Sequence, residues 1–388
     1  MLRQLGLFHT PLAEVGRGID GSVWEGCFNA KESSIHQLSP YVGKMKSGMA
    51  NALIEEFSLA GDVVLDPFCG SGVVPCEALL TGRHAIGNDL NPYAYALTKG
   101  KLSAPPTHTE AAARALRALD EAAEESVSLE EIPDWVRAFF HPKTLEEAVA
   151  LARVLKRRRD YFLLACLLGI LHHVRPGFLS YPASHLVPYL RVNKYPAETY
   201  PDMYRYRSVR PRLLAKIARA YRRFIPPNPE LTRVVLRENA MSLPCESNSV
   251  DAIISSPPYY GALDYGRDNR LRLWFLGVDD YREVDSKLTS NEKVYVPEMT
   301  RAVGEMLRLL KPSKCAVLVL GDYNRNGRKQ DSAAALSQIV QDNYCSRASV
   351  VKLLVDEIPD ERRARRRTQT TKHETIIVIR KLTKCLAG

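Results

Sequence analysis

The stretch Val63-Val64-Leu65-Asp66-Pro67-Phe68-Cys69-Gly70-Ser71-Gly72 decides the fold of this 388-residue chain. Three apolar residues predict a short strand that ends at Asp66, and the glycine-rich turn leads into residues 73–80, which are typical of a helix. A second strand is expected at 84–87, and it ends at Asn88-Asp89. The order strand, glycine loop, helix, strand and acid is that of a nucleotide-binding βαβ unit.

The glycine loop offers groups that match several parts of one small ligand. Gly70 and Gly72 permit a sharp turn and a close approach to the backbone, and the amides at the helix start favour a carboxylate. Asp66 can accept hydrogen bonds from an ammonium, and Asp89 stands where an acid would receive ribose hydroxyls. S-adenosyl-L-methionine carries all of these groups. Pro75 replaces the third glycine of the dinucleotide fingerprint, which counts against a nicotinamide cofactor.

A second motif, Ser256-Pro257-Pro258-Tyr259, follows the apolar run at 250–254 directly. Two prolines end a strand abruptly and fix the directions of nearby carbonyls. Tyr259 then offers a flat face on which a planar base can stack. The Ser256 hydroxyl and the Pro257 carbonyl can accept the two hydrogens of an exocyclic amino group, which leaves its lone pair aimed at a methyl donor. The motif therefore predicts transfer to an amino nitrogen.

With these two motifs the sequence resembles the DNA amino-methyltransferases, which make N4-methylcytosine or N6-methyladenine. The resemblance covers about residues 33–102 and 231–382, and it includes Ser39-Pro40-Tyr41-Val42-Gly43-Lys44 ahead of the cofactor loop. It implies that S-adenosyl-L-methionine is held by Asp66, Pro67, Phe68, Gly70, Ser71, Gly72 and Asp89. Asn239 stands where the family usually has an acid, and it would contact the adenine of the cofactor as an amide.

The family likeness leaves the target base open between two choices. A leading Ser is commoner among enzymes that act on cytosine N4, whereas Asp or Asn is commoner for adenine N6. Cytosine N4 is therefore favoured over adenine N6. The same residues are also compatible with an RNA-base methyltransferase and with a catalytically inactive nucleic-acid-binding module.

The basic charge of the chain is concentrated in two short stretches. The net charge is +10. Residues 191–223 carry ten basic residues against two acids, and residues 361–372 carry six against one. Concentrated positive charge suits a phosphate backbone, so double-stranded DNA is the expected partner. The arginines expected to contact it are Arg205, Arg207, Arg210, Arg267, Arg363, Arg365 and Arg366.

The remaining elements predict a class I (Rossmann-like) α/β methyltransferase fold. Strands are expected at 234–236, 250–254 and 316–320, and a final hairpin at 351–358 and 374–380 gives a mostly parallel seven-stranded sheet an antiparallel edge. Residues 1–102 and 231–388 would form the methyltransferase domain. Residues 103–230 read as a mainly helical insert that recognises the target, with helices at 111–123, 145–155, 161–172 and 212–224. A helix is also expected at 296–310.

Other residue patterns carry no further chemistry. The eight cysteines include no C-x-x-C pair, so reduced thiols in a cytoplasmic protein are expected and no metal site is. A carbon-5 cytosine enzyme would need a nucleophilic Cys at the Ser256 motif, and Cys76 and Cys245 are expected to be structural. Cys69 is expected to be a small filler. No signal peptide or membrane-spanning run is recognised, and a partner restriction endonuclease is conceivable for such a family.

Overall fold

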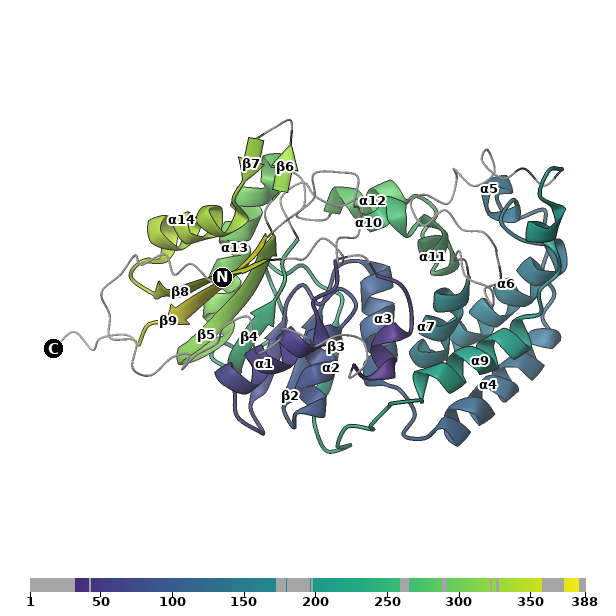
Figure 1. The fold of residues 1–388 in the computed structure, drawn as a ribbon, viewed down its shortest axis with the longest axis horizontal. Helices are drawn as coiled ribbons and strands as arrows, with labels where there is room; N and C mark the ends of the chain where they lie inside the picture. The colour runs from purple at the N-terminus through teal and green to yellow at the C-terminus, as the bar shows by residue number, and fades with distance from the viewer. Residues whose placement is uncertain are drawn as a thin grey trace.

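A computed structural model describes most of the chain, namely residues 32–41, 43–171, 179, 196, 198–258, 265–287, 292–321, 323–325, 328–357 and 373–383. A seven-stranded sheet in the order β3-β2-β1-β4-β5-β9-β8 forms its centre (Figure 1). Its strands are β1 (Val63–Asp66), β2 (His84–Asn88), β3 (Arg233–Leu236), β4 (Val250–Ser255), β5 (Leu310–Gly321), β8 (Ala348–Glu357) and β9 (His373–Lys381).

The pairing of the strands confirms the predicted class I methyltransferase sheet. Strands β1 to β5 pair in parallel, with Leu65 beside Ile253 at the centre. Strand β9 enters antiparallel between β5 and β8. Successive strands are added on one side of β1 as far as β3 and on its other side from β4 onwards. The carboxyl ends of β1 and β4 therefore border a switch point, where ligands of such sheets bind.

Alternate side chains of the central strands face two separate hydrophobic cores. Val64 and Ile254 point into one core, whereas Leu65 and Ile253 point into the other. Because successive side chains of a strand alternate between faces, runs that are apolar at every position are buried on both sides. This explains why β4 is buried along its whole length.

Helices cover both faces of the sheet. One core contains residues of α1 (Ser47–Phe57), α2 (Val73–Leu80) and α3 (Pro92–Leu102). The other contains residues of α13 (Glu292–Leu309) and α14 (Ser332–Tyr344). The shorter elements are η2 (Ser34–Gln37), which precedes α1, and three helices that follow β4, namely α10 (Tyr265–Asp268), α11 (Arg270–Phe275) and α12 (Tyr281–Lys287). Strands β6 (Tyr323–Arg325) and β7 (Arg328–Gln330) form a separate two-stranded ribbon.

The region between β2 and β3 is helical, as the sequence predicts. Its elements are α4 (His108–Ala123), α5 (Asp134–Arg137), α6 (Pro142–Arg157), α7 (Tyr161–Ile170), η3 (Pro201–Tyr204) and α9 (Val209–Ala220). Helix α7 lies against α3 so closely that a Cβ on Gly100 would come within 2.6 Å of the Tyr161 carbonyl oxygen. The helices therefore share a core with the sheet domain.

Several elements differ from the sequence-based expectation. The prediction named neither α3 nor α14, although Asn91 and Asp331 cap them by accepting from the Tyr93 and Ala334 amides. Helix α9 covers residues 209–220 instead of 212–224, and α13 starts four residues earlier than expected. In the sequence, Asn91-Pro92 and Asp331-Ser332 were the signals for the starts of α3 and α14. Among the described helices, none combines the length and apolarity that crossing a membrane requires.

Candidate active site

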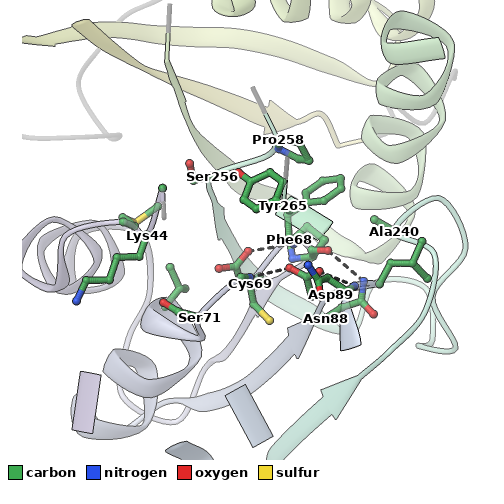
Figure 2. A pocket seen from close by; sticks show the side chains of 18 of the residues that line it. Lys44, Phe68, Cys69, Ser71, Asn88, Asp89, Ala240, Ser256, Pro258 and Tyr265 are labelled. Atoms are coloured by element: carbon green, nitrogen blue, oxygen red, sulfur yellow. Dashed lines mark hydrogen bonds between the residues drawn. The ribbon is translucent and has the colours of Figure 1, made fainter. Parts of the chain in front are cut away.

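A hollow opens at the carboxyl ends of β1, β2 and β4, and both sequence motifs line it (Figure 2). It encloses about 900 Å³, open solvent included. Residues predicted to bind the cofactor line it together, namely Asp66, Pro67, Phe68, Gly70, Ser71, Asp89 and Asn239.

Asp66 sits at the end of β1 with only 3% of its surface exposed. The Ser255 hydroxyl donates to its Oδ1 at 2.5 Å, and the Phe68 amide donates to the same oxygen at 3.1 Å. Burial raises the pKa of Asp66 to about 7, and the nearby Asp89 acts in the same direction. Because Ser255 directly precedes the catalytic motif, this hydrogen bond joins the two motifs.

Asp89, at the end of β2, holds the glycine loop in place. The Gly70 amide donates to its Oδ2 at 2.8 Å, and the Asn91 amide donates to its Oδ1 at 2.9 Å. Burial raises the pKa of Asp89 to about 6. Each carboxylate oxygen has a further lone pair, so Asp89 can still accept a ribose hydroxyl from within the hollow.

Gly72 is required by a close approach between the loop and α3. It has a φ of +73° and caps α2, and a Cβ there would lie 2.6 Å from Thr98 Oγ1. Thr98 Oγ1 also lies 3.3 Å from the Cys69 thiol and donates to the Gly70 carbonyl at 3.2 Å. Only a residue without a side chain fits this place, and Gly72 therefore shapes the pocket from outside its lining.

Asn88 is a site residue that the sequence analysis did not single out. Its Nδ2 donates to the carbonyls of Pro67 and Glu238 at 3.1 and 3.0 Å, and the Glu238 amide donates back to its Oδ1 at 2.9 Å. It thereby ties the loop after β1 to the loop after β3. A polar residue at a strand end, beside Asp89, was the signal that could have found it.

Asn239 lies in the lining of the hollow, where its side chain also holds a turn. Its Oδ1 accepts from the Met241 amide at 3.0 Å. The Nδ2 is therefore the group that Asn239 can offer to a ligand. Donation from an amide to an adenine ring nitrogen is compatible with this arrangement.

The catalytic motif meets the hollow at the end of β4. Ser256 and Pro258 line it, while Pro257 is buried behind them. Figure 2 shows Ser256 and Pro258 on the same side as Tyr265, facing Phe68 and Asp89. Tyr259 lies outside the described residues.

Two tyrosines that the predicted site does not include close the side of the hollow. Tyr41 and Tyr265 both line it, and their rings stack with centroids 6.0 Å apart. Burial raises the pKa of both phenols, and the Asp89 carboxylate raises it further. Both hydroxyls therefore stay neutral at physiological pH and can donate to a ligand.

Comparison with known proteins finds similarities to DNA methyltransferases. Residues 20–100 match the model of a DNA methylase family. The chain is 25% identical over 275 residues to the type II methyltransferase M.BsoBI of Geobacillus stearothermophilus, covering 64% of this chain and 54% of that protein. In these matches the chain is similar to the DNA amino-methyltransferases. It spans about half the length of M.BsoBI.

Two further similarities are weaker. Type II methyltransferase M.MjaII of Methanocaldococcus jannaschii is 29% identical over 68 residues, or 18% of this chain and 13% of that protein. Among solved structures, TrmN from Thermus thermophilus aligns with a TM-score of 0.36 at 12% identity, covering 90% of this chain and 53% of that one. The fold assignment therefore stands on the strand order of the sheet itself.

The residues that line the hollow fit S-adenosyl-L-methionine. Asp66 is a buried carboxylate with no ion pair among the described residues, so the ammonium of a ligand would satisfy it. The start of α2 presents its amides to the hollow beside Ser71 and suits a carboxylate. Asp89 offers acceptors for the ribose.

Of the arginines expected to contact DNA, the four that the structure describes are absent from the lining of the hollow. Arg205 pairs with Asp202, and Arg210 pairs with Asp120 on α4. The backbone of Arg207 exchanges hydrogen bonds with the Thr144 hydroxyl. Arg267 lies on α10, two residues after Tyr265. Arg363, Arg365 and Arg366 lie outside the described residues.

Two buried cysteines near the glycine loop have the environment of structural thiols. Cys69 and Cys76 are each only 6% exposed. Burial raises the pKa of Cys69 well above its usual value and that of Cys76 to about 12. A thiol held so far from ionisation is a poor nucleophile, which is compatible with the predicted roles of Cys76 as a structural residue and Cys69 as a small filler.

Proposed function

We propose that this protein transfers a methyl group from S-adenosyl-L-methionine to the exocyclic amino nitrogen of a base flipped out of double-stranded DNA, with cytosine N4 as the favoured target. One observation carries the proposal. Ser256 and Pro258 line the same hollow as Asp66 and Asp89. A methyl donor held by the two carboxylates would therefore meet an amino group held by the Ser-Pro-Pro motif.

The chain would act mainly by orientation and exclusion of water. An exocyclic amino nitrogen is a weak nucleophile because its lone pair is delocalised into the ring. The Ser256 hydroxyl and the Pro257 carbonyl would accept its two hydrogens and turn the lone pair towards the methyl group that the bound cofactor supplies. Tyr259 would stack on the base. Direct in-line transfer then needs positioning more than a strong base.

The helical insert would supply much of the contact with DNA. It contributes Arg205, Arg207 and Arg210, and Arg267 and the run at 362–367 would add further phosphate contacts. Such contacts make binding strongly dependent on salt. Because two relatives are named type II methyltransferases, a role in the cytoplasm beside a cognate restriction endonuclease belongs to the same proposal.

Methyl transfer from labelled cofactor to duplex DNA, with RNA in parallel, tests the proposal directly. Label on DNA, recovered as N4-methylcytosine after digestion to nucleosides, is the expected result. N6-methyladenine would replace the cytosine assignment by the adenine one. Label on RNA alone would overturn the DNA assignment, and no label with either substrate would favour a nucleic-acid-binding module without activity.

Ser256→Ala separates the roles of the two motifs. Turnover should fall about a hundredfold because one acceptor for the amino group is lost, while the Kd of the cofactor stays within about twofold. Ser249→Ala is the matched control, since Ser249 precedes β4 and its hydroxyl donates to the Glu246 carbonyl at 2.6 Å. An equal loss of cofactor binding in Ser256→Ala would contradict the placement of Ser256 against the base.

A further inference from the structure

Arg272 of α11 is a buried cation whose described partners include no carboxylate. Only 5% of its surface is exposed. Its Nε donates to the Leu168 carbonyl at 3.2 Å, its Nη1 donates to Asn269 Oδ1 at 3.3 Å, and its guanidinium lies over the Tyr93 ring, 5.5 Å from the centroid. Burial of an arginine is costly unless its donors are satisfied, so these partners explain how it is retained there.

Two routes lead from Arg272 to the wall of the hollow. The shorter passes through Asn269, whose Nδ2 donates to the Tyr265 carbonyl at 3.0 Å. The longer route passes through aromatic rings. The ring centroids of Tyr93 and Tyr41 lie 5.8 Å apart, and the Tyr41 ring stacks on the Tyr265 ring with centroids 6.0 Å apart. Both routes end at Tyr265, so Arg272 holds this residue by its backbone and by its ring.

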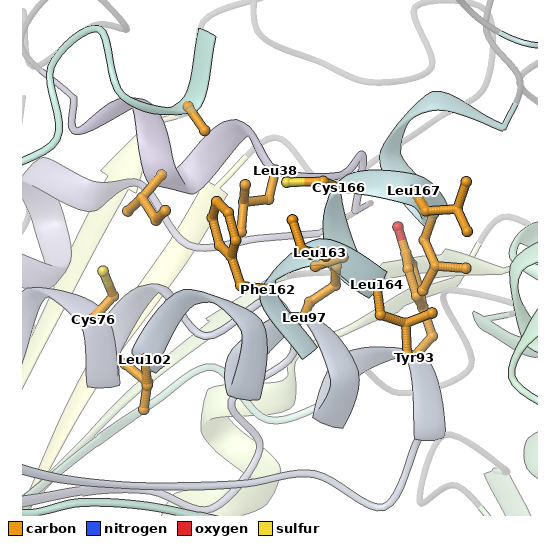
Figure 3. Packing of buried hydrophobic residues seen from close by; sticks show 14 of the residues in the cluster. Leu38, Cys76, Tyr93, Leu97, Leu102, Phe162, Leu163, Leu164, Cys166 and Leu167 are labelled. Atoms are coloured by element: carbon orange, nitrogen blue, oxygen red, sulfur yellow. The ribbon is translucent and has the colours of Figure 1, made fainter. Parts of the chain in front are cut away.

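The other end of the tether is fixed to the helical insert. Leu168 is a fully buried residue of α7, and the last four carbonyls of a helix have no partner within it. Arg272 satisfies one of them. Figure 3 shows α7 packed along α3, with Leu164 and Leu167 close to Tyr93. In Figure 1, α10, α11 and α12 lie between the carboxyl edge of the sheet and the insert.

Tyr265 stands where the target base would enter the hollow. It shares the lining with Ser256 and Pro258. The backbone of α10 is also fixed from its other side, because the Gly266 amide donates to Asp285 Oδ1 at 2.6 Å. In-line transfer tolerates little misplacement of the base. A wall held at several points in this way therefore suits the positioning of the target.

We propose that Arg272 is a positioning residue for methyl transfer, which holds Tyr265 as the target-side wall of the hollow and ties that wall to helix α7 of the insert. The inference rests on the proposed function and deepens it. Arg272 acts through Asn269 and Tyr93. Loss of its guanidinium would therefore misplace the base and leave the distant cofactor contacts of Asp66 intact.

Single-turnover methyl transfer to duplex DNA by Arg272→Gln tests this inference. The rate constant should fall at least tenfold, and the Kd of S-adenosyl-L-homocysteine should stay within about twofold. Measurements are made well below the melting temperature of each variant. Arg272→Lys, which keeps the charge and loses the fork of donors, should fall between the wild type and Arg272→Gln.

Arg83→Gln is the matched control for the loss of a buried arginine. Arg83 is 9% exposed, and its guanidinium donates to the Ser58 carbonyl at 2.8 Å at the amino end of the sheet. It should lose thermal stability and keep the wild-type rate constant. An Arg272→Gln variant that behaves like this control, destabilised with an unchanged rate constant, would overturn the inference.

A double-mutant cycle identifies the residue through which Arg272 acts. If Tyr265 is that residue, the effects of Arg272→Gln and Tyr265→Leu on the rate constant will not add, because either change alone removes the same wall. Additive effects would overturn the inference. Asn269→Ala provides the same test should Arg272→Gln not fold. Wild-type protein that methylates neither DNA nor RNA would instead overturn the proposed function.

Discussion

The cofactor hollow and the helical insert handle charge in opposite ways. The hollow holds Asp66 and Asp89 away from water, with backbone amides and a hydroxyl as their partners. The insert pairs its cations on the surface, where Arg157 and Arg158 share Glu121 and Arg210 meets Asp120. Among the described residues, the two carboxylates of the hollow have no cationic partner, whereas these arginines of the insert are paired with acids.

This contrast shows that the net charge of a region differs from the number of its charged side chains that are free to bind a ligand. Part of the basic excess of the insert is used within the fold. On α9, Lys216 is an example, because its Nζ donates to the Gln37 carbonyl at 2.6 Å. A carboxylate that burial has moved to a pKa of about 7 indicates a ligand more strongly than a surface arginine does. The predictions below test the two halves of the contrast.

The largest effect is expected from Asp66→Asn. The substitution keeps an oxygen for the Ser255 hydroxyl and removes the charge that would meet the cofactor ammonium. A charge-assisted hydrogen bond contributes about 2–3 kcal/mol, so the Kd of S-adenosyl-L-methionine should rise roughly thirtyfold to a hundredfold in calorimetry. Asp62→Asn, at the other end of β1, is the control. A Kd within threefold of the wild type would remove Asp66 from the cofactor site.

A pH dependence of about tenfold is expected next. The ionised form of Asp66 would bind the ammonium of the cofactor. With a pKa of about 7, only about a tenth of the Asp66 side chains are ionised at pH 6. The Kd of the cofactor should therefore be about tenfold weaker at pH 6 than at pH 8. Asp66→Asn should lose most of this dependence. A flat profile in the wild type would contradict the raised pKa.

The raised pKa of Asp66 also makes the cofactor-free protein less stable as the pH rises. The folded-state pKa of Asp66 lies above its unfolded value, so the folded state binds more protons between about pH 4 and 7. Its contribution to stability is therefore present below the unfolded pKa and is lost as the pH rises through 7. Asp89, raised to about 6, adds to this trend.

A smaller effect is expected for Lys101 beneath the glycine loop. It is 4% exposed, and among the described residues its Nζ has no hydrogen-bond partner. Burial lowers its pKa to about 8. Lys101→Met should stabilise the fold by about 1–2 kcal/mol in chemical denaturation at pH 7, because it removes an uncompensated buried charge. A destabilised variant would show that the ammonium has a partner in solution.

The pH dependence of stability checks the same residue. The folded state gives up the Lys101 proton more readily than the unfolded state, so this lysine makes stability rise between about pH 8 and 10.5. The rise should be smaller in Lys101→Met. An identical slope in both proteins would argue against the lowered pKa.

The smallest effects are expected on the surface of the insert. Arg210 is paired with Asp120, so Arg210→Ala should change DNA affinity less than twofold. Arg222, just beyond α9, forms no ion pair among the described residues, and Arg222→Ala should weaken binding about threefold with a shallower salt dependence. Fluorescence anisotropy at two salt concentrations measures both. Equal losses would show that DNA competes successfully for paired arginines.

Local sequence was sufficient to predict those elements whose residue pattern lies within one short segment. The glycine loop, the Ser-Pro-Pro motif and the strands at 63–65, 84–87 and 250–254 appear where they were expected, since apolar runs that end in Gly, Pro or Asp have few other conformations open to them. Helices α3 and α14 were not foreseen, because Asn91 and Asp331 were not recognised as caps. The roles assigned to the individual site residues stay predictions.

The sequence by itself determined the fold class, and it predicted the likeness to the DNA amino-methyltransferases and the groups that would meet a cofactor, because that chemistry depends on short motifs at strand ends. Only the tertiary structure decided which side chains surround them. The bond from Ser255 to Asp66 spans 189 residues. The Tyr41–Tyr265 stack and the bond from Arg272 to Leu168 also join segments that are far apart in the chain. Such contacts leave no periodic pattern, since they arise when separate elements pack at one edge of the sheet.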